Sequence, residues 1–216
     1  MASNVFGTPI TDETLKALPE YHNKQISQKD RAYVAMDMKN AEGKDVNARK
    51  FVEDLREHFH EEQATLCLIY NATGDPVIYV RDYQWQGHLC GSPYPVVISN
   101  GQWGAFLHGQ WSYKSDTQAA VVYSGKNDGG HNKHWLITWR HNTNGINRVY
   151  TEIRQPQYYD KDDVFQNYVS DLLVSSNSAS VCKANDDGGL LLGSIGNMAS
   201  SVLEAIMTLP VTIGLE

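Results

Sequence analysis

Histidine is the residue type in this sequence with the widest possible chemistry, because imidazole can bind a metal or move a proton near neutral pH. The chain contains eight histidines. His58 and His60 lie two residues apart on a predicted helix, a spacing that points side chains to different sides. His131 and His134 flank the start of a predicted strand. These positions favour exposed or packed histidines; the alternative is a general base or a metal site in the loop after Gly125.

Clustered aspartates could offer oxygen ligands to calcium. They are Asp160, Asp162, Asp163, Asp186 and Asp187. The first group precedes an apolar period and is more simply the start of a helix, where acidic residues suit the helix dipole. The second group precedes two glycines and is more simply a turn. The sequence contains no phosphate-binding glycine loop, nucleophile-elbow serine or zinc-type cysteine pair. We therefore predict no catalytic residue, no metal site and no cofactor.

Aromatic residues crowd the centre of the chain. Trp135 and Trp139 share a predicted strand face with Ile137, so we expect them in the core. A second group lies at predicted strand ends or in loops rich in Gly, Ser and Gln, where rings can stack on sugars or enter a membrane interface. The candidate ligand-binding residues of this group are Tyr83, Trp85, Tyr94, Trp111 and Tyr113. The alternative is that these rings cap a small core.

Composition limits the class of protein. Hydrophobic residues make up 41% of the 216 residues and charged residues 20%, which is enough to bury a sizeable core. The formal net charge of -7 argues against a general affinity for nucleic acid. No apolar run approaches the roughly 18 residues of a membrane span. We expect no transmembrane segment, while peripheral membrane contact is possible and the oligomeric state stays open.

Cysteine usage predicts the compartment. Cys67, Cys90 and Cys182 are odd in number and widely spaced, which is typical of a reducing environment. The first residues have neither a basic start nor an apolar core, so they do not read as a secretory signal. The expected location is the cytoplasm.

Short apolar runs separated by turns predict the fold. They begin at Thr65 and continue to Ile153. Asn100-Gly101 stands between two such runs and is a strong hairpin signal, because both central residues of that turn need positive φ. Several strands at this spacing predict an antiparallel β-sandwich.

Helical patterns precede and follow the predicted strands. Thr11 can cap a short helix that Pro19 ends, and Ser27 can begin a capping box for a helix over 28–41. A clearer apolar period predicts a helix over 46–62. We therefore predict a helical segment over residues 1–62 that packs on a β-sandwich over residues 63–216, the whole forming one structural domain.

The last third of the chain is predicted to add three elements. Residues 160–173 have a helical period, with Val164, Tyr168 and Leu172 on one side. Leu190 to Leu192 reads as a strand, and residues 202–209 read as a helix.

Several sequence segments resemble a plant family. They are ASNVFGTPITDETLKALPEY, AEGKDVNARKFVEDLRE, TLCLIYNATGDPVIYV, GQWGAFLH and AVVYSGKN, which together span about residues 1–127. They resemble the 23 kDa jasmonate-induced proteins, a family similar to the nakanori and actinoporin-like lipid-binding proteins. The resemblance implies a mainly β fold, an actinoporin-like antiparallel β-sandwich preceded by an N-terminal helical segment. It also implies a sphingolipid head group or a sugar as ligand, and it supplies no catalytic residues.

Three functions are compatible with these patterns. We rank first a stress-induced, defence-related, non-catalytic module that binds a lipid head group or a glycan through aromatic loops. A ligand-free structural or storage-like stress protein follows. A small-molecule enzyme of plant specialised metabolism, using a His or Asp as general acid or base, comes last.

Overall fold

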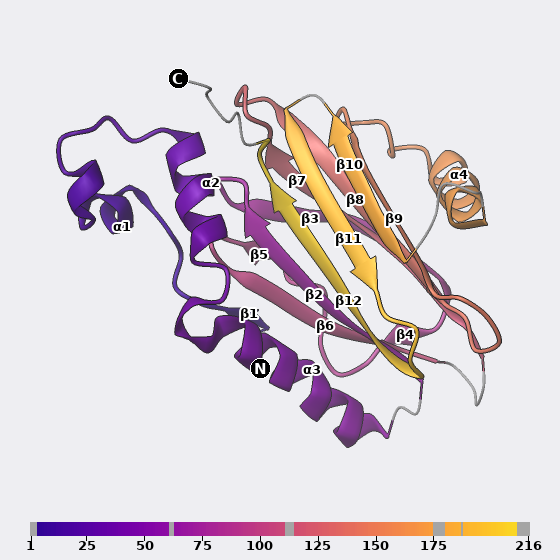
Figure 1. Cartoon of the computed structure of the whole chain (residues 1–216). Coiled ribbons are helices and arrows are strands. Elements are labelled where there is room, and N and C mark those ends of the chain that lie inside the picture. Colours follow the sequence, from indigo (N-terminus) through magenta and orange to yellow (C-terminus); the bar gives the residue numbers. More distant parts are fainter. Residues whose placement is uncertain (1–3, 61–62, 111–114, 175–179, 187, 211–216) are drawn as a thin grey trace.

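Two β-sheets pack face to face in the computed structural model, which describes residues 4–60, 63–110, 115–174, 180–186 and 188–210 (Figure 1). The first sheet has the strand order β1-β6-β2-β12-β11-β10, with β4 paired to β6. The second has the order β5-β3-β7-β8-β9. The predicted β-sandwich is therefore confirmed.

The first sheet consists of β1 (Val5–Phe6), β2 (Ala64–Ala72), β4 (His88–Leu89), β6 (Trp103–Gly109), β10 (Val181–Asp186), β11 (Gly189–Ile195) and β12 (Ser200–Thr208). The second sheet consists of β3 (Val77–Gln86), β5 (Val97–Ile98), β7 (Thr117–Lys126), β8 (Asn132–His141) and β9 (Arg148–Arg154). The helices are α1 (Asp12–Lys16), η1 (Pro19–Tyr21), α2 (Gln28–Asp37), η2 (Ala41–Gly43), α3 (Lys44–Phe59) and α4 (Asp162–Val174).

Two details of the C-terminal region differ from the expectation. Residues 202–209, predicted to be helical, lie mostly in strand β12. This strand pairs with β2 in parallel, from Ser200 opposite Ala64 to Thr208 opposite Ala72, so the sandwich contains one parallel pair among antiparallel ones. A short, mostly apolar run suits a strand as well as it suits a helix, and the pairing with β2 decides between them.

The core between the sheets follows the period of two along each strand. On β8, Trp135, Ile137 and Trp139 are fully buried, as their alternation predicted. They meet Cys67 and Ile69 of β2 and other residues of the opposite sheet.

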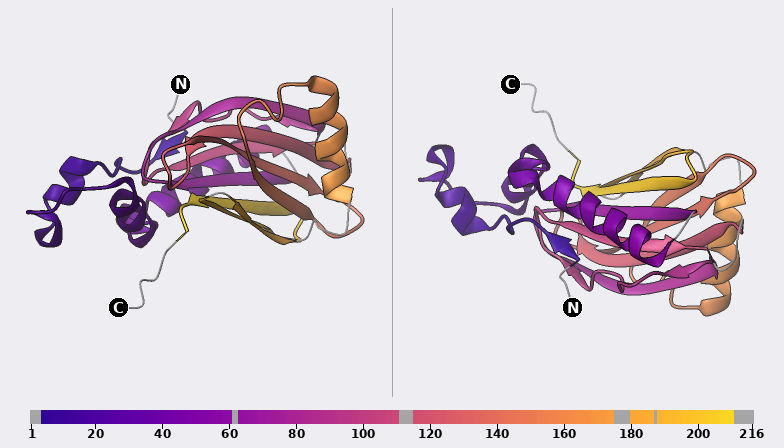
Figure 2. Two further views of the ribbon diagram at one scale, coloured as in Figure 1. Left: turned by 90° about the horizontal axis from the view of Figure 1, so that it is seen from above. Right: turned by 90° about the horizontal axis from the view of Figure 1, so that it is seen from below.

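The outer faces of the sheets are covered by helices. Helix α3 packs on β6 and β2, and α2 packs on β2. A separate apolar cluster joins Phe165 and Val169 of α4 to Ala120, Val122 and Leu136 on the outer face of the second sheet. Figure 2 shows α1 and α2 at one end of the sandwich and α4 at the other side. Helix α4 matches the helix that was predicted over residues 160–173.

The N-terminal helices begin where the sequence predicts. Thr11 and Ser27 both form capping boxes, which satisfy backbone N–H groups of the first turn. Helix α2 ends at Asp37, earlier than predicted, and Gly43 adopts a positive φ before α3 begins.

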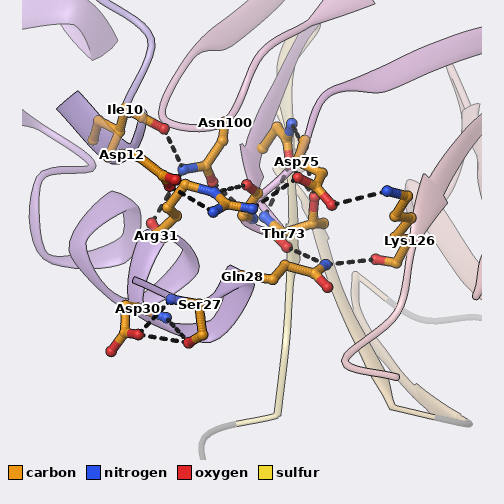
Figure 3. A network of polar contacts seen from close by, with 12 residues as sticks. Ile10, Asp12, Ser27, Gln28, Asp30, Arg31, Thr73, Asp75, Asn100 and Lys126 are labelled. Carbon is orange, nitrogen blue, oxygen red and sulfur yellow. Dashed lines mark hydrogen bonds and ion pairs between the residues drawn. The ribbon is translucent and has the colours of Figure 1, made fainter. Parts of the chain in front are cut away.

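A polar network joins these helices to loops of the sandwich (Figure 3). The Arg31 guanidinium contacts Asp12 at 2.7 Å and Asp75 at 3.0 Å, and its Nε donates to the carbonyl oxygen of Gly74 at 2.7 Å. Asn100 donates to the carbonyl oxygen of Arg31 at 3.1 Å. One arginine therefore ties α1, α2 and the β2–β3 loop together.

All three cysteines are free. None of the helices in the described segments combines the length and the apolar content that crossing a lipid bilayer requires.

A substitution at Gly74 tests how closely helix α2 approaches the β2–β3 loop. Its φ is +85°, and an added Cβ would clash with the backbone carbonyl of Gln28. We expect Gly74→Ala to lower the free energy of unfolding by about 3 kcal/mol, from the left-handed conformation and the clash together. Gly43→Ala is the matched control, because its φ is +64° but its Cβ would meet nothing within 4 Å. Urea denaturation should show a loss of only about 1 kcal/mol for the control; equal losses would contradict the close approach.

Candidate ligand-binding site

Two of the five predicted binding residues lie on the outer face of the second sheet. Tyr83 and Trp85 belong to β3, and their rings contact each other at a centroid distance of 4.9 Å. Both are half-buried and pack against the cluster beneath α4. They therefore stand within a strand beside a helix, not in a loop.

The structure places the other three differently. Tyr94 is buried between the sheets, where its ring stacks on Tyr79 and meets Phe106 edge-on at 4.7 Å. The expectation that Tyr94 presents its ring to a ligand at a strand end is wrong, because the ring packs into the core cluster between the two sheets. Trp111 and Tyr113 lie outside the described residues.

The same outer face holds a buried carboxylate on β9. Glu152 is 5% exposed, and its Oε1 accepts a hydrogen bond from the Tyr159 hydroxyl at 2.5 Å. Its Oε2 accepts from Tyr168 at 2.8 Å, from Tyr150 at 3.3 Å and from Arg154 Nη2 at 2.8 Å. Four donors thus satisfy a charge that would otherwise be costly to bury.

Helix α4 and the loop before it supply the tyrosines of this network. Tyr168 projects from α4, while Tyr159 lies in the loop and is buried edge-on against Phe165 at 5.5 Å. The Arg81 guanidinium of β3 lies 4.5 Å from the centre of the Phe165 ring and donates to the carbonyl oxygen of Tyr159. These contacts fix the loop and the helix against the sheet.

Arg154 and Tyr158 form the exposed part of the network. The Arg154 guanidinium lies 4.9 Å from the centre of the Tyr158 ring and donates to the Tyr168 hydroxyl at 3.2 Å. Tyr158 is 41% exposed, so part of its ring faces solvent. We call Tyr150, Glu152, Arg154, Tyr158, Tyr159 and Tyr168 the tyrosine site.

A pocket opens beside the tyrosine site. Its volume is about 430 Å³, within the range of small-molecule sites. It is lined by Lys133, Ile153, Arg154, Gln155, Tyr158 and Asp186. The pocket therefore combines two cationic side chains, an amide, a carboxylate and an aromatic ring.

Burial keeps the tyrosine hydroxyls protonated. It raises the pKa of Tyr150 to about 12, and it raises the pKa values of Tyr159 and Tyr168 further above the usual range. The Glu152 carboxylate adds to each shift, because it accepts hydrogen bonds from the neutral phenols. These tyrosines therefore act as hydrogen-bond donors and not as nucleophiles.

The histidines do not converge. His131 is exposed, while His134 lies near Tyr159, where burial lowers its pKa. His141 contacts the carbonyl oxygen of Met198. Within the described segments, no group of three or more histidine, cysteine, aspartate or glutamate side chains could hold a metal ion.

Sequence reasoning missed most of the tyrosine site, although two signals were present. Tyr150, Glu152 and Arg154 alternate along one strand and therefore share a face. The pair Tyr158-Tyr159 directly precedes a predicted helix. Nothing in the sequence indicates that α4 packs over β9.

Comparisons with known proteins find relatives over most of the chain. A family model described as Nakanori-like protein matches residues 6–210. The 23 kDa jasmonate-induced protein of Hordeum vulgare is 48% identical over 161 residues, which is 74% of this chain and 76% of that protein. A jasmonate-induced protein homolog of Atriplex canescens is 30% identical over 103 residues, which is 46% of this chain and 55% of that protein.

The solved structures add a likeness of fold. The crystal structure of the lipid binding protein Nakanori superposes with a TM-score of 0.83 at 23% sequence identity. The superposition covers 94% of this chain and 99% of that one.

The buried His108 of β6 should make stability depend on pH. Burial, with a smaller effect of His88, lowers the pKa of His108 to about 3. In the unfolded chain the imidazole of His108 takes up a proton near pH 6.5, whereas in the folded chain it does so only near pH 3. The stability contributed by neutral His108 is therefore complete above pH 6.5 and is lost as the pH falls toward 3. We expect the free energy of unfolding to drop by about 2 kcal/mol between pH 7.5 and pH 5 through this residue.

Urea denaturation at the two pH values measures this contribution. His108→Leu should reduce the difference between pH 7.5 and pH 5, leaving a smaller slope from His134 and His141, whose pKa values burial also lowers. His22→Leu, which changes an exposed histidine, should leave the difference unchanged. An unaltered pH dependence in His108→Leu would show that this histidine is not the cause.

Proposed function

This chain belongs to the Nakanori-like protein family and is a relative of the 23 kDa jasmonate-induced proteins, and on that premise we propose that it is a defence-related, non-catalytic protein that binds a lipid head group at the tyrosine site. The observation that carries the proposal is the buried Glu152, whose four donors hold Arg154 and the tyrosines in place beside an open pocket.

The chemistry of the pocket suits a zwitterionic or anionic head group. Arg154 and Lys133 line it with positive charge and Asp186 with negative charge, and arginine binds phosphate through several N–H donors. The exposed part of the Tyr158 ring offers a π face, which attracts quaternary ammonium groups. A head group with a phosphate and a choline would use both.

A glycan is the second candidate ligand, and the polar side chains that line the pocket favour it. Gln155 and Asp186 place planar polar groups next to the Tyr158 ring. Hydroxyl groups of a sugar could bond to these side chains while an apolar sugar face covers the ring.

Recognition fits this site better than acid–base catalysis. Both oxygens of Glu152 accept hydrogen bonds, so the carboxylate is occupied by the protein itself. The raised pKa values of Tyr159 and Tyr168 keep their protons in place at neutral pH. A general base needs a free acceptor within reach of a substrate proton, and this network does not offer one at Glu152.

We also propose that the protein acts in the cytosol and meets membranes peripherally. Its free cysteines support a reducing compartment.

Binding to vesicles tests the lipid proposal. The wild-type protein should co-sediment with vesicles of sphingomyelin or phosphatidylcholine and should bind soluble phosphocholine in a calorimeter. Tyr158→Ala removes the exposed ring and should weaken both interactions about tenfold, which corresponds to about 1.4 kcal/mol. Arg154→Lys keeps the charge but loses the planar donor set, so it should weaken binding of the phosphate as well.

Control variants distinguish binding at the tyrosine site from non-specific binding. Phe59→Ala removes a half-exposed ring on α3, against the opposite sheet, and should leave binding unchanged. A glycan array run with wild type and Tyr158→Ala distinguishes a sugar from a lipid ligand. Absence of binding to vesicles, phosphocholine and glycans would favour the ligand-free stress protein instead.

A further inference from the structure

The outer face of the first sheet is covered on one side only. Helices α2 and α3 pack over β2 and β6, while Figure 1 shows β11 and β10 without a helix in front of them. Leu190 and Leu192 of β11 point to this face, because their neighbour Leu191 is fully buried in the core. Both leucines are therefore only half-buried.

A groove lies where the cover ends, between α2 and the strands β11 and β12. Its volume is about 480 Å³, and it is lined by Tyr33, Met36 and Asp37 of α2, by Leu190 and Leu192 of β11 and by Leu209. The leucines form its floor and the α2 side chains form a wall. The volume is typical of a site for a small apolar molecule.

The charges at the rim of the groove are mainly negative. The only lysine among the lining residues, Lys29, pairs with Asp128 at 3.2 Å. Asp30 accepts from Ser27 in the capping box, while Asp37 is exposed at the end of α2. The formal net charge of -7 has the same sign. A cation at the rim is therefore favoured over an anion.

We propose that this groove binds a single-chain alkyl amphiphile with a cationic head, its chain on Leu190 and Leu192 and its ammonium group near Asp37. The site lies on the opposite sheet from the tyrosine site and does not depend on the function proposed there.

Three probes with equal chains and different heads test the proposal. Dodecylamine, dodecanol and dodecanoate are titrated into the protein at pH 7.5 by calorimetry, below the concentrations at which they self-associate. Dodecylamine, which is cationic at this pH, should bind about tenfold more tightly than dodecanoate, with dodecanol between them.

Variants locate the binding. Leu192→Gln places an amide on the floor and should weaken all three probes about tenfold, whereas Val181→Gln, at a position 71% exposed on the neighbouring strand, should not. Asp37→Asn should weaken dodecylamine about threefold and spare dodecanol. Asp54→Asn makes the same change at an exposed position of α3 and should alter neither.

Several results would overturn the proposal. They are the absence of saturable dodecylamine binding, equal affinity for dodecanoate, and binding that Leu192→Gln leaves intact. A wild-type dimer in analytical ultracentrifugation that Leu192→Gln dissociates would assign the groove to a second copy instead. Because Leu192→Gln could perturb folding, the Asp37→Asn variant on the surface tests the charge preference independently, and thermal unfolding checks both.

Discussion

Both sheets of this protein carry apolar side chains on two faces, and the sandwich can bury only one face of each. Strands β2, β6, β7 and β8 are buried along nearly their whole length. The inner faces meet each other, so the outer faces need helices. Helices α2 and α3 cover one sheet and α4 covers the other. The groove lies beside α2, where the cover of the first sheet ends, and the pocket lies beside Tyr158 in the loop before α4.

The packing of α4 on the second sheet depends on the hydrogen bonds to Glu152, because leaving this buried carboxylate unpaired would cost free energy. An unpaired carboxylate at Glu152 would lose several kcal/mol of hydration without repayment. Tyr159 and Tyr168 supply donors from the loop and the helix, and Arg154 supplies one from the strand. Each donor is held by the same acceptor, so the side chains that face the pocket are ordered before a ligand arrives. Such pre-organisation lowers the entropy lost on binding.

Capping and periodicity rules predicted most helices and strands well, but they predicted poorly how these elements pack against one another. The burial of Trp135 and Trp139 follows from strand alternation alone, and the Ser27 capping box is set within four residues. Tyr94 was misplaced because its loop has a surface composition but packs inward, which is a tertiary effect. The helix over residues 202–209 was wrong for a similar reason, since parallel pairing with β2 overrides an ambiguous apolar run.

The candidate binding surfaces required contacts that no single segment contains. Tyr158, Tyr168 and Glu152 come from a loop, a helix and a strand, and none of these segments alone indicates a site. The five aromatic residues selected from the sequence included Tyr83 and Trp85, which pack against the same cluster. Aromatic content therefore pointed to the sheet face on which the tyrosine site lies, whereas the polar residues at the pocket come together only in the folded chain.

The two surfaces differ in the charged side chains that line them, although the chain as a whole is acidic. The pocket is lined by Arg154, Lys133 and Asp186, whereas the groove is lined by Lys29, Asp30 and Asp37. Asp186 of the pocket pairs with Gly189, which directly precedes Leu190 of the groove, so the two surfaces meet along the β10–β11 pair. The proposed ligands of the two surfaces are therefore distinguished by the side chains that line each surface and not by the distance between them.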